Sequence, residues 1–205
     1  MKKVICVGSG PGGVDYVNNI PNLDGMDVVG VNNVWKGTDR WTNLIYAGDY
    51  YDAHKIVVTN PDKQKLHSRG SFQKSYIWGS NNMPWEQARI YCGLPIYFTT
   101  MYWTMYYLKP DVIGCIGFDM DYTPGPDGST SFYGVGYDMK TRGEPDPLYQ
   151  FKHHYKDLES PMGTLLQRLN NKRIEVGCEI VNLSDNPKTQ LNWEYNSWEQ
   201  FYDKK

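Results

Sequence analysis

Residues 2–33 decide the fold, and they read KKVICVGSGPGGVDYVNNIPNLDGMDVVGVNN. The apolar, β-branched run Val4–Val7 predicts a buried strand, and a second run, Met26–Val31, predicts another. Between them lie a glycine-rich turn, residues 8–13, and a segment that we expect to be helical, residues 14–19. The stretch therefore predicts a strand, a glycine turn, a helix and a second strand.

The turn matches the pattern G-x-G-x-x-G through Gly8, Gly10 and Gly13. In such units the backbone N–H groups and the helix N-terminus face an anion, and glycine lets a phosphate approach the main chain. We expect a nucleotide or phosphate here; the alternative is a tight turn that only packs the helix on the strand. NAD and FAD are disfavoured, because Asn32 and Asn33 stand where dinucleotide folds place an acidic residue.

The rest of the chain alternates between predicted strands and predicted helices. We expect strands at residues 43–46, 55–59 and 111–118, helices at 99–108 and 161–170, and a last strand or pair of strands within 174–183. Residues 111–118 are almost continuously apolar, as in a central parallel strand covered on both faces. The alternation predicts an α/β fold: a single Rossmann-like domain over residues 1–205, with a mainly parallel sheet sandwiched by helices.

One long segment and the tail complete the predicted domain. Residues 123–157 include a long stretch rich in Gly, Pro, Asp and Tyr, and a connection this long inside a compact domain is usually functional. We expect this segment to form a small lid-like insertion. The tail from Asn186 is polar and aromatic, and we expect it to lie on the surface.

Composition narrows the partners and the compartment. The formal net charge is −2, so nucleic acid is not an expected partner. Aromatic residues make up 15% of the chain, and surplus Tyr and Trp suit stacking on bases or sugar rings. The cysteines form no C-x-x-C pair and indicate buried free thiols in a reducing compartment. We see no signal peptide and no membrane span, and expect a cytoplasmic protein, with homo-oligomerisation left open.

Polar groups follow several predicted strands at their C-terminal ends. These groups are the glycine turn, Asn32, the segment from Asp119 to Tyr122, and Asn182 with Ser184. Ligands in open parallel sheets bind beyond the C-terminal ends of the strands. We therefore expect these groups to converge on one site.

Asp119 and Asp121 form a D-x-D pattern after the central strand. Carboxylate oxygens of this kind suit a magnesium or manganese ion that bridges a diphosphate. The alternative is that Asp119 accepts hydrogen bonds within the loops at the sheet edge. We assign no metal site, but a metal-dependent nucleotide-sugar enzyme that uses this pair stays an alternative.

Two adjacent histidines, His153 and His154, follow the long segment and precede the last predicted helix. A histidine on a segment over a pocket suits a general base, because its unperturbed pKa is near neutrality. The alternative is a solvated surface pair. We favour His154 over His153 as the base, and we expect His54 and His67 to be exposed in their polar stretches.

Several of these pieces, in this order, resemble a known family. The matching pieces are Val7–Pro11, Gly30–Asn33, the helix ending in Leu108, Ile116–Asp119, and His153 and His154 ahead of Val181–Ser184. In this order they look like the bacterial α-2,3/2,8 sialyltransferases of the Campylobacter lipooligosaccharide type and the related motility-accessory-factor proteins. That family usually opens with G-x-G-P-S and has a later strand of the form L-x-G-x-D, followed by tyrosines.

The resemblance implies a glycosyltransferase that moves a sugar from CMP-sialic acid, or a similar nucleotide-activated donor, to a hydroxyl of a glycan or other acceptor. It implies no cofactor beyond that donor. One of the paired histidines would deprotonate the acceptor hydroxyl. The residues that the resemblance places around the donor are Gly8, Ser9, Gly10, Pro11, Asn32, Thr99, Thr100, Gly117, Asp119, Tyr122 and Tyr133. Tyr122 and Tyr133 would lie near the departing phosphate, where tyrosine hydroxyls can stabilise the anion.

The chain also departs from the family pattern. Gly12 replaces the usual serine, and residues 46–48 read Tyr-Ala-Gly where a second asparagine that contacts the nucleotide is expected. These departures keep a second reading open. In it, the protein is a non-catalytic, Rossmann-like nucleotide-binding or structural protein.

Overall fold

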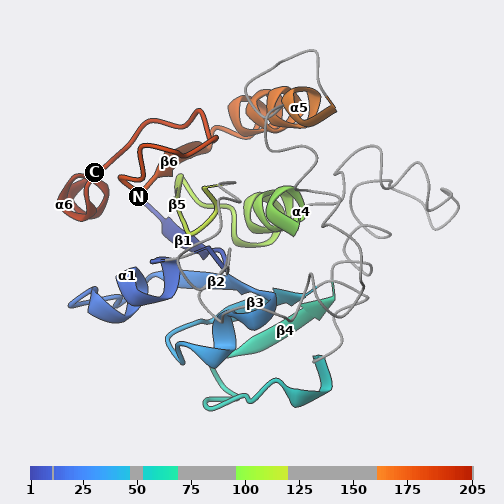
Figure 1. Cartoon of the computed structure of the whole chain (residues 1–205), viewed down its shortest axis with the longest axis vertical. Coiled ribbons are helices and arrows are strands. Elements are labelled where there is room, and N and C mark those ends of the chain that lie inside the picture. The colour runs from blue at the N-terminus through green and yellow to red at the C-terminus, as the bar shows by residue number, and fades with distance from the viewer. Residues whose placement is uncertain (11, 47–52, 69–95, 120–160, 205) are drawn as a thin grey trace, which may run out of the picture.

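The described part of the chain is built on one sheet of six strands, all parallel, in the order β4-β3-β2-β1-β5-β6 (Figure 1). The computed structural model describes residues 1–10, 12–46, 53–68, 96–119 and 161–204. The strands are β1 (Lys3–Val7), β2 (Asp27–Val31), β3 (Asn43–Tyr46), β4 (Lys65–Ser68), β5 (Val112–Ile116) and β6 (Glu179–Asn182). The predicted α/β fold with a mainly parallel sheet is confirmed.

Strands β1 and β5 form the centre of the sheet. They pair in register from Lys3 opposite Val112 to Val7 opposite Ile116. All of β5, and all of β1 except Lys3, is buried. This explains the nearly continuous apolar run in the sequence, because a central parallel strand is covered on both faces.

Helices cover both faces of the sheet (Figure 1). Helices α1 (Gly13–Asn19) and α6 (Trp198–Asp203) lie on one face, and α4 (Ile96–Trp103) and α5 (Pro161–Glu175) lie on the other. Two neighbouring residues of β5 face these two layers. A Cβ placed on Gly114 would meet Phe201 of α6, whereas the Cys115 thiol contacts Met101 of α4. The arrangement is a doubly wound α/β sandwich.

Helix α4 is buried from Tyr97 onward and continues without a break into a π-helical turn, η4 (Thr104–Leu108). The sequence predicts this buried helix, although it begins three residues earlier than expected, at Ile96. The cysteine thiols under the helix are free, as predicted for Cys6, Cys115 and Cys178. Burial raises the pKa of the Cys6 thiol to about 12, so the thiol stays neutral.

The predicted strand at 55–59 is wrong, and the true edge strand lies ten residues later. Residues 53–55 form a short 3₁₀ turn, η2 (Ala53–Lys55), and Val57 beyond it is 57% exposed. Strand β4 pairs only with β3, and its Leu66 is 41% exposed. An edge strand that is half exposed to solvent does not require an apolar sequence. The sequence of β4 therefore looks like that of a polar loop.

The C-terminal third differs from prediction in two places. Helix α5 continues to Glu175, beyond the predicted end at residue 170, and of the two predicted alternatives the described residues show the single last strand, β6. The tail is not confined to the surface, because Leu191 and Phe201 are buried in the core. Residues 194–196 also pair with β6: the Asn182 amide donates to the Glu194 carbonyl, and the Asn196 amide donates to the Asn182 carbonyl. Burial of Leu191 and Phe201, together with these backbone hydrogen bonds, therefore holds the tail against the sheet.

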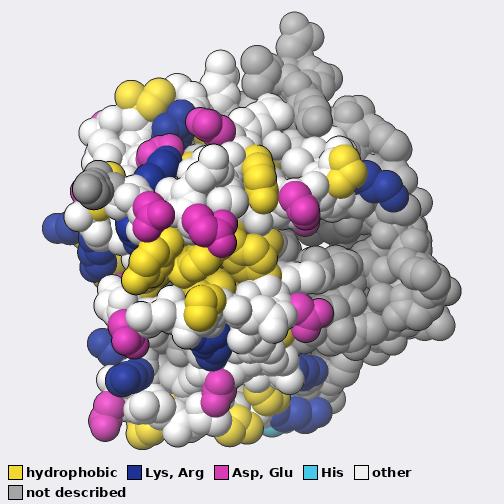
Figure 2. All heavy atoms as spheres, turned by 90° about the vertical axis from the view of Figure 1, so that its left-hand side faces the viewer, with side chains coloured by type: hydrophobic (Ala, Val, Ile, Leu, Met, Phe, Trp, Pro, Cys, Tyr) yellow, Lys and Arg dark blue, Asp and Glu magenta, His cyan; other side chains and the backbone are white. Residues whose placement is uncertain are grey.

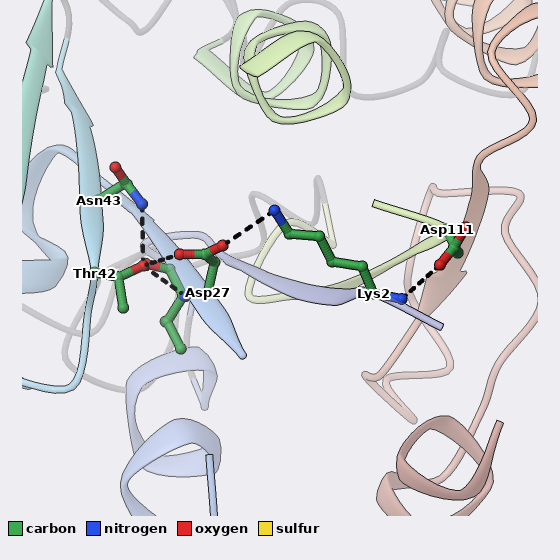
Figure 3. Close-up of polar contacts among 6 residues, drawn as sticks. Lys2, Asp27, Thr42, Asn43 and Asp111 are labelled. Carbon is green, nitrogen blue, oxygen red and sulfur yellow. Dashed lines mark hydrogen bonds and ion pairs between the residues drawn. The ribbon is translucent and has the colours of Figure 1, made fainter. Parts of the chain in front are cut away.

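The edge where the strands begin carries a polar network (Figure 3). The Thr42 hydroxyl donates to Asp27 at 3.2 Å and accepts from the Asn43 amide at 3.0 Å. The Lys2 ammonium lies 3.8 Å from Asp27, and the Lys2 backbone amide donates to Asp111. This network links the starts of four strands.

In the described part of the chain, no helix has the length and apolarity that a bilayer crossing requires.

Candidate functional site

The glycine turn lies against the end of β5. The Gly8 amide donates to the Ile116 carbonyl at 2.8 Å, and the Gly10 amide donates to the Gly117 carbonyl at 2.9 Å. The two loops that leave the central strands therefore meet at the point where the strand order reverses, between β1 and β5. Doubly wound sheets bind their ligands outside this switch point.

The glycines are required by this contact between backbones. A Cβ on Gly8 would lie 2.2 Å from the Gly117 carbonyl oxygen, and a Cβ on Gly10 would lie 2.7 Å from the same atom. Gly117 itself has a φ of +72°, which other residues rarely adopt. The alternative interpretation of the motif, a tight packing turn, thus has a direct physical basis, and the predicted phosphate contact stays a prediction.

The same hydrogen bonds limit how the turn could hold a phosphate. The Gly8 and Gly10 N–H groups already donate to the carbonyls of Ile116, at the end of β5, and of Gly117, just after it. A phosphate at this edge would therefore use other groups of the turn, such as the half-buried Ser9. Gly12 precedes helix α1 with a φ of +82°, and a Cβ there would meet nothing within 4 Å. The turn is open on that side.

Asn32 and Asn33 follow β2, next to the end of β1. Asn32 has a left-handed φ of 44° and opens the 3₁₀ turn η1 (Asn32–Lys36). Asn33 is 1% exposed, whereas Asn32 is half-buried. Of the pair, Asn32 is the residue that a ligand could reach, as the sequence interpretation proposes.

Asp119 and Ser184 meet where β5 and β6 end. The Ser184 hydroxyl donates to an Asp119 carboxylate oxygen at 3.1 Å, and the Ser184 amide donates to the Asn182 side chain at 3.1 Å. The Asp119 backbone carbonyl accepts from the Gln190 amide at 2.8 Å. The structure thus brings together three residues that the sequence placed at strand ends, and it gives the carboxylate a role in joining the loops.

A metal has no ready-made site in the described part of the chain, where no cluster of three or more His, Cys, Asp or Glu side chains could hold one. Asp121, the second member of the D-x-D pattern, lies outside the described residues. The metal-dependent alternative therefore stays untested.

Thr99 and Thr100 lie in the first turns of α4, and both are 0% exposed. The Thr100 hydroxyl donates to the Ile96 carbonyl at 2.8 Å, a bond within the helix. Their side chains serve the packing of α4 in this structure. A contact with a ligand stays a prediction.

An aromatic cluster near this edge has no counterpart in the sequence interpretation. The Trp193 indole N–H donates to the hydroxyl of Tyr97, whose ring centroid is 5.1 Å from that of Phe118. The Arg173 guanidinium lies 5.5 Å from the centroid of the Trp193 ring. Together these contacts hold the start of α4, the residues after β5 and the C-terminal tail in one arrangement. The high aromatic content is the only signal that the sequence offers for it.

His67 is half-buried, so the prediction that it is exposed is wrong. Its Nε2 atom lies 3.1 Å from the Asn43 side-chain oxygen, and its ring centroid is 4.5 Å from that of Trp103. Burial, and then the charge of Lys65, lower the pKa of His67. His54 is exposed, as predicted.

Several predicted site residues lie outside the described residues. They are Pro11, Tyr122, Tyr133, His153, His154 and the lid-like insertion 123–157. Their roles stay predictions from the sequence.

Ser184→Ala should lower the free energy of unfolding by about 1.5–3 kcal/mol, because the Asp119 carboxylate then loses the hydrogen bond that it accepts from the Ser184 hydroxyl, and a bond to a charged group contributes about this much. Urea unfolding checks this. Ser184→Thr is the matched control: it keeps the hydroxyl and should lose clearly less. A Ser184→Ala protein as stable as the wild type would show that the bond contributes nothing in solution.

Comparisons with known proteins add little to this geometry. No protein-family model matches the chain, and no curated protein gives a significant match. Among solved structures, the Campylobacter jejuni sialyltransferase CstII in complex with CMP-3FNeuAc is 16% identical with a TM-score of 0.45, over 97% of this chain and 93% of that one. The same enzyme in complex with cytidine-5'-monophosphate is 13% identical with a TM-score of 0.40, over 91% of this chain and 81% of that one. At this level of similarity the fold assignment rests on the sheet itself.

Proposed function

We propose that the chain is a glycosyltransferase that binds a nucleotide-activated sugar at the C-terminal edge of its sheet. One observation carries the proposal: the glycine turn, Asn32, and the pair of Asp119 and Ser184 all follow neighbouring parallel strands at one edge. Doubly wound sheets bind nucleotides at this edge, beside the switch point. The sequence resemblance set out above supports a CMP-linked sialic acid, or a similar sugar, as the donor.

The groups around the switch point suit a nucleotide more than a dinucleotide. Asn32 can hydrogen-bond a ribose or a base, but it lacks the negative charge that holds ribose hydroxyls in NAD and FAD folds. Ser9 offers a hydroxyl to a phosphate at the glycine turn, where it is half-buried. These features support a mononucleotide donor bound between the turn and Asn32.

The transfer step is proposed to use His154, or else His153, as the base that accepts the proton of the acceptor hydroxyl. The anomeric carbon then bonds to that oxygen as the bond to the donor phosphate breaks, and the phosphate leaves with the nucleotide. Tyr122 and Tyr133 are proposed to donate hydrogen bonds to the leaving phosphate. The acceptor is proposed to be a glycan or another hydroxyl compound.

A non-catalytic nucleotide-binding or structural protein is the second candidate. Two observations favour it: the Gly8 and Gly10 amides donate to the carbonyls at and just after the end of β5, and Thr99 and Thr100 are fully buried. A third candidate is a metal-dependent enzyme that uses Asp119 and Asp121. Loss of turnover in EDTA would distinguish this enzyme from the proposed one, whose mechanism involves no metal.

Thermal unfolding with CMP, UDP, NAD and FAD tests the proposed donor site. A ligand that binds only the folded state adds about 2.7 kcal/mol of stability at a hundredfold its Kd, so a true ligand should raise the unfolding temperature by several degrees. We expect CMP to raise it and NAD and FAD to leave it unchanged. Asn32→Ala should reduce the shift with CMP. A shift with NAD alone would exclude the transferase.

A further inference from the structure

One surface away from the sheet edge is aromatic and acidic, and the proposed function does not use it. We call it the α1–α6 surface and define it by Tyr16 on α1, Tyr195 before α6, and Trp198 and Tyr202 on α6. Figure 2 looks at the side of the molecule that carries these helices and shows a continuous hydrophobic area with acidic side chains along its upper border and Lys or Arg side chains to its left and beneath it. Tyr195 is 50% exposed and Tyr202 is 41% exposed.

Contacts beneath the exposed aromatic rings hold them in fixed positions. The Trp198 ring centroid lies 5.4 Å from that of Tyr202 and 5.9 Å from that of Phe201, which is fully buried. A capping box between Ser197 and Gln200 fixes the start of α6. Tyr16 and Trp198 also pack partly against the core. The exposed rings are therefore held in place before any partner arrives, which reduces the entropy cost of binding.

One part of the border of the surface is negatively charged. Asp185 and Glu199 lie close enough to Tyr16 to contribute to its raised pKa of about 12, after the larger effects of burial and of Tyr195. Asp15, Glu194 and Asp203 add further carboxylates on the same segments. Lys204, the last described base of the tail, is paired with Glu179.

The surface already binds one cation of the chain itself. The Lys3 ammonium lies 5.6 Å from the centroid of the Tyr202 ring, and it also donates to the Tyr202 carbonyl. Ammonium groups are attracted to the faces of aromatic rings, and most strongly to Trp. A cationic side chain of a partner could make the same contact with the neighbouring aromatic rings.

We propose that the α1–α6 surface docks a basic amphipathic helix of a partner protein. The apolar side of such a helix would lie on the exposed rings of Tyr195, Trp198 and Tyr202. Its Lys and Arg side chains would reach the carboxylates of Asp185 and Glu199 at the border. A second copy of this chain suits the surface less well, because two acidic borders would then face each other and repel.

The test uses the full chain and a synthetic amphipathic helix made of leucine and lysine, with the leucines on one face. We expect fluorescence anisotropy of the labelled peptide to show binding, and the same peptide with glutamate in place of lysine to show none. Added salt should weaken the binding, since the border charges contribute to it. The double variant Tyr195→Ala, Tyr202→Ala should weaken binding about tenfold or more, as expected for aromatic residues at the centre of an interface.

Matched controls locate the binding. Tyr106 and Tyr107 are 43% and 51% exposed in η4, on the opposite layer of the fold, and their double alanine variant should bind the lysine peptide like the wild type. Asp185→Asn with Glu199→Gln should weaken binding and reduce its dependence on salt. Absence of binding by the lysine peptide, equal binding of the glutamate peptide, or equal loss in both tyrosine pairs would overturn the proposal. So would a dimer in sedimentation that Tyr195→Ala with Tyr202→Ala dissociates, because the occupant is then a second copy.

Discussion

Replacing His154 with alanine should lower the turnover of sugar transfer by about 10²–10⁴-fold, the usual contribution of a positioned general base. The acceptor hydroxyl is a weak nucleophile until a base takes its proton, so the variant must react through water or an unassisted hydroxyl. The histidine is proposed to act on the acceptor hydroxyl, whereas the nucleotide of the donor is proposed to bind between the glycine turn and Asn32. The affinity for the donor should therefore change little, and the loss should appear in kcat.

His153→Ala is the matched control for this variant, since the two histidines are adjacent in the sequence. We expect the smaller effect from His153. Turnover is measured with the donor that thermal unfolding identifies, and donor affinity is measured separately by the size of the thermal shift. Wild-type turnover in both variants would exclude both histidines as the base. Loss of donor binding in both variants would give the pair a structural role instead.

The first strand, turn, helix and second strand could be predicted within one residue, because their signals are local. β1 and β2 are short β-branched runs in the middle of the sheet, and their burial imposes an apolar sequence. The segment 55–59 carries the same kind of run but pairs with nothing as a strand, since Val57 faces solvent. Propensity alone cannot separate these cases, because strand formation also needs a partner strand and a covering layer.

The candidate site was harder to predict, because its contacts join residues far apart in the sequence. Ser184 and Asp119 could each be placed at a strand end, and parallel pairing of β5 with β6 brings them within a hydrogen bond. His67 on strand β4 is covered in part by the ring of Trp103, which belongs to helix α4. No local pattern reports such a contact, so a histidine in a polar stretch reads as exposed.

The glycine motif also takes part in a contact between residues far apart in the sequence, which the motif itself does not reveal. The spacing of Gly8, Gly10 and Gly13 favours a phosphate-binding turn. The structure gives the first two an additional constraint, the Gly117 carbonyl, which lies more than a hundred positions along the chain. One sequence pattern thus fits two physical demands: close approach by another backbone, which the structure has, and close approach by a ligand, which stays a prediction. Only a substitution can show which demand dominates.

Gly8→Ala should lower the free energy of unfolding by about 3 kcal/mol, the upper part of the range for overpacking a rigid site. The new Cβ would lie 2.2 Å from the Gly117 oxygen and 2.6 Å from its carbonyl carbon. Neither side can move easily, because the Gly8 amide is bonded to Ile116 and both backbones belong to the central strands or their ends. This is a large fraction of the total stability of a typical domain.

Gly25→Ala is the matched control, measured by urea unfolding alongside Gly8→Ala. Gly25 has a φ of +76°, but a Cβ there would meet nothing within 4 Å, so its variant should lose only about 1–2 kcal/mol from the left-handed backbone. The two substitutions thereby separate backbone strain from steric contact, provided that the slope with urea is unchanged. A Gly8→Ala protein that loses no more than Gly25→Ala would contradict the close contact with Gly117. If that protein also loses its thermal shift with CMP, the turn has room for a Cβ only when no ligand is bound, and the glycine serves the nucleotide.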